Sequence, residues 1–232
     1  MRNKKIIFIV TGFIFSVFFV FSLYKFFTVK QIIIIGNKHL PDSEIRAILG
    51  IKEGHSILYP SSKNIYDRLK KSPWIKEAKI RKDLNGKLTI FIQESTPTAI
   101  LQHNSRYYLV SNDGEVLEDF TDKIKESKIF LPVIKELDPF KDKKTLIDAL
   151  NLIIFVKTKN YVNPEDEIII TGSTSENLTL NVNGFPIIVG TGDYETKFSK
   201  YMIVVTESQK RGLSLEYVDL RFPDKVIVKP SQ

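Results

Sequence analysis

The chain has 232 residues, of which 43% are hydrophobic and 26% charged, a composition that excludes a disordered protein. It contains no cysteine, so no disulfide stabilises the fold. The net charge of +7 is unevenly divided, because residues 29–95 hold 13 basic and 7 acidic side chains, whereas residues 96–232 hold 17 and 20.

The N-terminus predicts a transmembrane helix. Ile6 to Tyr24 is an uncharged run of 19 residues, which as a helix spans about 28 Å. The run is long for a signal peptide, and no A-x-A-like cleavage pattern follows it, so we expect an uncleaved anchor. The preceding basic residues place the N-terminus in the cytoplasm by the positive-inside rule; they are Arg2, Lys4 and Lys5. We therefore expect a cytoplasmic tail at 1–5, an anchor at 6–27 and an exported remainder.

Residues 28–96 predict a β-α-α-β-β domain. The isoleucine run from Ile32 to Ile35, closed by Gly36-Asn37, is typical of a buried strand, with residues 28–30 as a short connector from the anchor. LPDSEIRAILGI and SSKNIYDRLKKSPWI have the apolar spacing of two short helices, with Gly50 ending the first and Ser61 or Ser62 capping the second. WIKEAKIRKDL and KLTIFIQE follow as a hairpin with Asn85-Gly86 at its turn.

Residues 97–232 predict a second α+β domain with a mostly antiparallel sheet. Seven β-like runs (TAILQH, RYYLVS, EIIIT, NLTLNV, PIIVG, LEYVDLRF and KVIVK) alternate with helices near residues 143–158 and 194–211. Asp193 is a suitable N-cap for the second helix. Its predicted buried stripe consists of Tyr194, Phe198, Tyr201, Met202 and Val205.

These segments, in this order, resemble the FtsQ/DivIB family of cell-division proteins. IIIIGN, LPDSEIRAILGI, SPWIKEAKIRKDL and LTIFIQESTPTA are similar to the POTRA domain of that family. YYLVSNDGEVLEDF and VDLRFPDKVIVKP resemble the beginning and the end of its β domain. The resemblance covers nearly the whole chain, including the anchor, and places POTRA at 28–96 and the β domain at 97–232. It implies a divisome protein of the cell (inner) membrane, located at the septum.

The sequence shows no constellation for catalysis or metal binding. Its S-x-x-K motif falls at Ser22 to Lys25, at the end of the anchor, and its three histidines, His39, His55 and His103, are far apart in sequence. Gly190-Thr-Gly192 lacks the third glycine and the basic residue of a phosphate loop. We therefore expect no catalytic residue, metal, cofactor or small-molecule substrate, and no nucleic acid partner, because an exported domain rarely meets one.

The resemblance implies a partner-binding strand at the C-terminus. In the family this region binds the membrane-anchored FtsB of the FtsL–FtsB pair by strand addition. The corresponding residues here are Arg221 and Phe222 after the VDL strand, and Asp224, Val226 and Val228 on the last strand. Phe222 would be an apolar anchor and Arg221 a charge partner for acidic residues of FtsB. A terminal strand is also a candidate for a sheet edge.

A second partner surface is expected on the POTRA domain, which in this family contacts other divisome proteins. Its candidates are Lys70, Lys71 and Lys76, whereas Trp74 beside them is expected in the core. Weak self-association is compatible with the family. Two alternatives remain at the sequence level: another POTRA-bearing protein of envelope assembly or secretion, and a single-pass cell-wall hydrolase.

Overall fold

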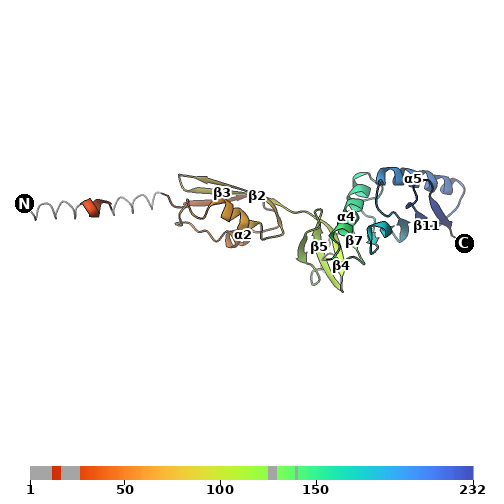
Figure 1. Ribbon diagram of the computed structural model, residues 1–232, viewed down its shortest axis with the longest axis horizontal. Helices are drawn as coiled ribbons and strands as arrows, with labels where there is room; N and C mark the ends of the chain where they lie inside the picture. The colour runs from red at the N-terminus through yellow and green to blue at the C-terminus, as the bar shows by residue number, and fades with distance from the viewer. Residues whose placement is uncertain (1–11, 17–26, 125–129, 139–140, 232) are drawn as a thin grey trace, which may run out of the picture. The chain divides into compact units, whose positions relative to one another are not determined.

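The computed structural model describes residues 12–16, 27–124, 130–138 and 141–231. The chain divides between Ser95 and Thr96 into two compact units, each combining helices with β-sheet (Figure 1). No helix in the described ranges is long and apolar enough to cross a membrane. Most of the predicted anchor, residues 6–27, lies outside those ranges, and residues 12–16 within it are helical.

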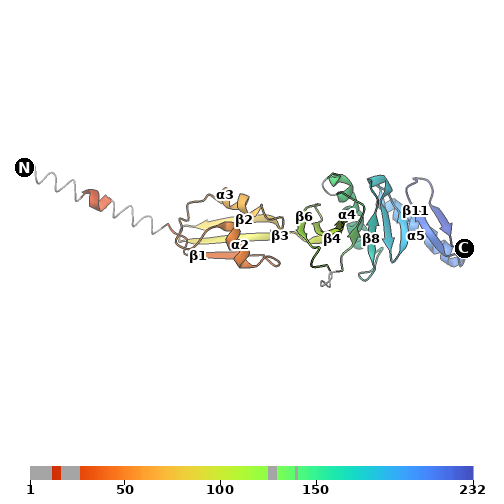
Figure 2. The same ribbon diagram turned by 90° about the horizontal axis from the view of Figure 1, so that it is seen from below.

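The described part of the first unit has the predicted β-α-α-β-β order. Its elements are β1 (Gln31–Ile35), α2 (Asp42–Leu49), α3 (Ser62–Leu69), β2 (Ile75–Asp83) and β3 (Lys87–Glu94). The strands lie side by side in the order β1-β3-β2, with β1 parallel and β2 antiparallel to the central β3 (Figure 2). Both helices bury an apolar side against this sheet, and their fully buried residues include Ile45, Leu49, Ile65 and Leu69.

Local chemistry ends these elements where the sequence predicts. Gly50 caps α2 in the left-handed conformation, at a φ of 63°, and the Ser61 side chain accepts a hydrogen bond from the Asn64 N–H at the start of α3. Gly86 has a φ of 95° in the β2–β3 turn. A Cβ at Gly86 would lie 2.6 Å from the Thr28 carbonyl oxygen, so the close approach of these two segments requires glycine.

The isoleucine run of β1 is buried on one side only, which corrects the expected fully buried strand. Ile32 is 4% exposed and lies on the helix side, whereas Ile35 is 45% exposed. Ile35 lies beside Phe91 of β3, which is also exposed. The sheet therefore has one face open to solvent, although β1 and β3 pair in parallel.

Residues 28–30 are part of the first unit, so the expected connector is wrong. Thr28 pairs with Ser56 in an isolated β-bridge, and Val29 is 2% exposed. The Val29 N–H donates to the His55 carbonyl over 2.7 Å, and the Lys30 N–H donates to the Gly86 carbonyl over 2.8 Å. The unit consequently begins without a spacer after the predicted anchor.

The described part of the second unit forms a nine-stranded sheet with two long helices. The strands are β4 (Pro97–His103), β5 (Arg106–Ser111), β6 (Val116–Asp119), β7 (Val133–Ile134), β8 (Ile168–Thr171), β9 (Thr179–Val182), β10 (Phe185–Ile188), β11 (Leu215–Asp219) and β12 (Ile227–Pro230). The helices are α4 (Lys143–Thr158) and α5 (Tyr194–Lys210), with a short 3-10 helix η1 (Ser175–Asn177).

The sheet order is β12-β11-β10-β9-β8-β7-β4-β5-β6. Most neighbouring strands in this described sheet are antiparallel, but β4–β7, β7–β8 and β10–β11 are parallel. Two of these parallel joins have a helix in their crossover connection, since α4 lies between β7 and β8 and α5 lies between β10 and β11. The connection from β4 to β7 contains β5 and β6 instead. The list of seven β-like runs omitted β6, a four-residue strand at one edge of this sheet, and β7, a two-residue strand inside it.

Both helices contribute to one hydrophobic core. Leu146, Leu150 and Ile153 of α4 are fully buried, and Phe198 of α5 is 1% exposed. Phe198 contacts the rings of Phe155, Tyr161 and Tyr201 at centroid distances of 5.5, 4.9 and 5.8 Å. Asp193 caps α5 as predicted, accepting from the Thr196 N–H. Met202 does not join the buried stripe, because it is 46% exposed.

Candidate partner-binding site

The last strand, β12, lies at one edge of the nine-stranded sheet of the described residues. It pairs with β11 in antiparallel register, with Val228 opposite Val218 and Ile227 opposite Asp219. The Ser231 N–H donates to the Ser214 carbonyl of the β11 side. Because backbone groups alternate in direction along a strand, those of Val228 lie on the side away from β11. Such a side can pair with another chain.

Pro230 limits the length of this free edge. By the same alternation, the backbone groups of Pro230 face away from β11, as those of Val228 do. Proline has no N–H, so it offers an incoming strand only a carbonyl acceptor. The pairing surface of β12 is therefore short and is centred on Val228.

The predicted strand residues lie in two different settings. Only Val228 belongs to β12, because Asp224 and Val226 precede the strand, which begins at Ile227. The expectation that all three lie on the last strand is thus wrong for Asp224 and Val226. Val226 and Val228 pack partly buried against the core, while Asp224 is exposed. The sequence interpretation missed Lys229, whose side chain on β12 is exposed to solvent and forms an ion pair with Glu216.

Arg221 is bound to a buried carboxylate. Its Nη2 donates to Asp219 Oδ2 over 2.8 Å, its Nε to Oδ1 over 3.1 Å, and its backbone N–H to Oδ1 over 3.0 Å. Asp219 is 5% exposed. Burial acts to raise the pKa of Asp219, but the hydrogen bonds and charge of Arg221 outweigh it and hold the pKa below its usual value. Arg221 therefore stabilises the end of β11, and only part of its guanidinium remains exposed.

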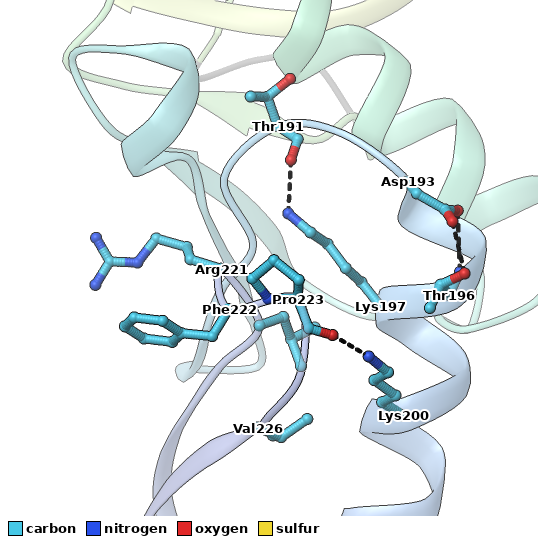
Figure 3. A pocket seen from close by; sticks show the side chains of 10 residues that line it. Thr191, Asp193, Thr196, Lys197, Lys200, Arg221, Phe222, Pro223 and Val226 are labelled. Carbon is cyan, nitrogen blue, oxygen red and sulfur yellow. Dashed lines mark hydrogen bonds between the residues drawn. The ribbon is translucent and has the colours of Figure 1, made fainter.

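Phe222 follows Arg221 in the loop between β11 and β12. Phe222 is 38% exposed, and the Lys225 ammonium lies over its ring at 5.2 Å from the ring centroid. The loop is connected to α5, because Lys200 Nζ donates to the Pro223 carbonyl (Figure 3). Phe222 is thus an aromatic side chain on a loop that Lys200 of α5 binds, and Lys225 of the same loop lies over its ring.

A cavity of about 310 Å³ lies between this loop and the first turns of α5 (Figure 3). It is lined by Thr191, Asp193, Thr196, Lys197, Lys200, Leu220, Arg221, Phe222, Pro223 and Val226. Lys197 Nζ donates to the Val189 and Thr191 carbonyls, each over 2.6 Å. Burial lowers the pKa of Lys197, against the opposing influence of Asp219 and Asp193. The cavity lining thus combines apolar side chains of the loop with charged side chains from both the loop and α5.

In the second predicted surface, Lys70 is bound by the backbone of its own unit, and a partner role of Lys70, Lys71 and Lys76 stays a prediction. Lys70 Nζ donates to the carbonyls of Ile75 and Lys76, over 3.2 and 2.7 Å, so it fixes the start of β2. Lys71 lies in a separate hollow between α2 and α3, together with Glu44. Trp74 is 7% exposed, which confirms its place in the core, and it stacks on His39 at a centroid distance of 3.7 Å.

Sequence reasoning missed Asp219, the buried partner of Arg221, and the two lysines of α5 that line the cavity. Asp219 and Arg221 are two residues apart, a spacing that puts both side chains on one face of a strand, and this signal could have paired them. Lys197 and Lys200 carry no comparable signal, because their approach to the loop depends on the crossover of α5. Within the described part of the chain, no three His, Asp or Glu side chains are grouped as a metal site.

Both units match domains of cell division proteins. Residues 27–95 match the model of the "POTRA domain, FtsQ-type", and residues 99–221 match "Cell division protein FtsQ/DivIB, C-terminal". The chain therefore belongs to the FtsQ/DivIB family, as its sequence pattern predicts. The FtsQ-type match excludes the alternative of a POTRA protein from another family. The second match ends at Arg221, so Phe222 and β12 lie beyond it.

Named relatives align over most of the chain. A cell division protein FtsQ of Geobacter sp. (strain M21) is 30% identical over 201 residues, which cover 83% of this chain and 72% of the relative. FtsQ of Geotalea daltonii is 29% identical over 88% of this chain and 76% of its own length. Cell division protein DivIB of Clostridium tetani is 26% identical over 88% of this chain and 80% of its own.

Proposed function

We propose that this protein is a non-enzymatic, single-pass membrane protein of the division septum that links septal wall-synthesis proteins by binding the FtsL–FtsB pair. The observation that carries the proposal is the position of β12 at the sheet edge, beside the exposed Phe222. Strand addition at an edge gains main-chain hydrogen bonds, and a neighbouring aromatic side chain adds specificity. The family membership supports a role in division.

Membrane anchoring rests on the uncharged run of residues 6–24. The described turn within it is helical, and its Phe13, Ile14 and Phe15 are 70%, 60% and 72% exposed. A helix that is apolar on every side suits lipid rather than water. The basic N-terminus orients the helix with residues 28–232 outside the cytoplasm.

The partner site is tested by binding measurements with the purified FtsL–FtsB pair of the same organism. We expect Phe222→Ala to weaken binding about tenfold or more, because an exposed aromatic anchor would be lost. Asp224→Lys should also change the affinity, because Asp224 is exposed beside Phe222. Ile203→Ala is the matched control, since Ile203 is an exposed apolar residue of α5 outside the cavity. Equal affinities for Phe222→Ala and the wild type would move the interface elsewhere.

The cellular role is tested by depletion. Loss of a septal linker should leave cells that grow and segregate chromosomes but do not divide, so they become filaments. A fluorescent fusion should gather at the septum in the same strain. Normal division after depletion, in a strain with no second copy of the gene, would refute the proposed role.

A further inference from the structure

One end of the first unit carries a cluster of exposed apolar loop tips. The chain enters the unit at this end, where the loop of residues 52–60 and the β2–β3 turn of residues 83–87 also lie (Figures 1 and 2). The Ile57 N–H donates to the Phe27 carbonyl, and the Lys30 N–H donates to the Gly86 carbonyl. The first residues of the unit are thus bonded to both the loop and the turn.

Three large apolar side chains project from this end. Leu58 is 61% exposed, Tyr59 74% and Leu84 63%. The loop and the turn are adjacent, because Lys82 Nζ donates to the Pro60 carbonyl. The core of the unit does not account for these side chains, since folding leaves most of their surface in water. We call Leu58, Tyr59 and Leu84 the apolar tips.

The tips are surrounded by positive charge. Residues 28–31, 52–60 and 81–87 contain five basic side chains against two carboxylates; the basic ones are Lys30, Lys52, Arg81, Lys82 and Lys87. Asp83 is already bonded to Arg81 over 3.0 Å, and Glu53 is the other carboxylate. Apolar and aromatic tips within a cationic surround match the interface of an anionic bilayer, where tyrosine is enriched and lysine attracts headgroups.

We infer that the apolar tips and the surrounding lysines dock this end of the unit on the anionic phospholipid surface of the membrane. The inference rests on the proposed anchor at residues 6–27. Because Thr28 is already paired with Ser56, no spacer separates the anchor from the unit, and the end bearing Leu58, Tyr59 and Leu84 must face the headgroups. The chain leaves the unit through Glu94 and Ser95 at the opposite end of the sheet, away from the docked surface.

We favour lipid over an acidic protein partner as the occupant, because this surface directly follows the uncharged run of residues 6–24 in the chain. A protein partner would need to reach the same end beside the anchor. The two occupants are distinguished by the lipid dependence of burial, since only the lipid surface requires phospholipid and responds to its charge.

The test uses the full chain, whose lack of cysteine allows a single label site. Tyr59→Cys and Leu84→Cys carry an environment-sensitive fluorophore, and the protein is reconstituted in vesicles of equal parts phosphatidylcholine and phosphatidylglycerol. We expect blue-shifted emission at both sites and its loss when nitroxide-labelled lipid is added. Lys38→Cys, on the exposed loop at the opposite end of the sheet, is the matched control and should keep the emission of a label in water.

Flotation of the vesicles separates the two proposals. Protein that floats while its labels at positions 59 and 84 remain in water would refute docking and leave the anchor intact. Protein that does not float would refute the anchor and the docking together. Labels buried only after addition of the FtsL–FtsB pair would identify a protein occupant and refute the lipid one.

The charge is tested with Lys52→Glu combined with Lys87→Glu. In the anionic vesicles this variant should show less quenching at Leu84→Cys than the unsubstituted background. Lys38→Glu combined with Lys71→Glu adds the same charge away from the tips and should change nothing. Quenching that is equal in anionic and purely phosphatidylcholine vesicles would refute the role of the lysines.

Discussion

Removing the Arg221 guanidinium should destabilise the second unit, because it leaves Asp219 buried without its main partner. Loss of one partner from a buried pair costs about 3–5 kcal/mol. The Arg221 side chain is 39% exposed against 7% for Asp219, so water screens part of the interaction. We therefore expect Arg221→Ala to cost about 2 kcal/mol, which lowers Tm by roughly 8 °C in a domain of this size.

The assay is thermal and urea unfolding followed by far-UV circular dichroism. Arg211→Ala is the control, because the Arg211–Glu207 pair lies on the exposed surface of α5 and should contribute about 0.5 kcal/mol or less. Trp74, the single tryptophan of the chain, lies in the first unit, and its fluorescence reports that unit. A loss confined to the dichroism transition would locate the effect in the second unit.

The pH dependence gives a further check on the Arg221–Asp219 pair. The folded-state pKa of Asp219 is depressed, so its stabilising contribution is present above the unfolded pKa of about 3.9 and is lost as pH falls through the folded pKa. In Arg221→Ala, burial should raise the pKa of Asp219. The stability difference between this variant and the wild type should therefore become smaller at acidic pH. Adding Asp219→Asn should restore part of the stability. If Arg221→Ala unfolds at the same temperature and urea concentration as the wild type at neutral pH, this reasoning is refuted.

Two further predictions concern packing and turn geometry. Phe198→Ala should cost about 3–5 kcal/mol by urea denaturation, because its buried ring contacts several aromatic neighbours, and a loss below about 1 kcal/mol would contradict the proposed core. Gly54→Ala should cost about 1–2 kcal/mol from its φ of 89°, whereas Gly86→Ala should cost more, since its Cβ would also meet the Thr28 carbonyl at 2.6 Å. Urea unfolding followed by Trp74 fluorescence measures both, and equal losses would exclude the steric contribution.

Local chemistry was readable from the sequence where a few neighbouring residues decide the structure. Gly50, Ser61 and Asp193 cap their helices as predicted, since each acts through its own backbone conformation or through a residue three positions away. Long-range pairing was less accessible. Val133–Ile134 forms β7 only because β4 and β8 lie on either side of it, and two residues carry no periodic signal.

The candidate site was predicted by position more than by role. The edge position of β12 is confirmed, but the sequence interpretation presented Arg221 as available for a partner. Arg221 is instead bound within the protein, because its Nε and Nη2 already donate to Asp219. Met202 shows a similar difficulty, since helical spacing places it beside Tyr201 without specifying how wide the covered stripe is. The partner contacts of Phe222, Asp224, Val226 and Val228 stay predictions.

The crossover from β10 through α5 to β11 affects the order in which the second unit can be completed. Until β11 arrives, β10 has a neighbour on one side only, among the strands described here. During synthesis, which begins at the N-terminus, the unit would pass through a stage in which β10 is the exposed edge of the sheet. A wrong strand could pair with it at that stage. The 26 residues from Val189 to Ser214, which include α5, must therefore fold back along the sheet before β11 can cover that edge.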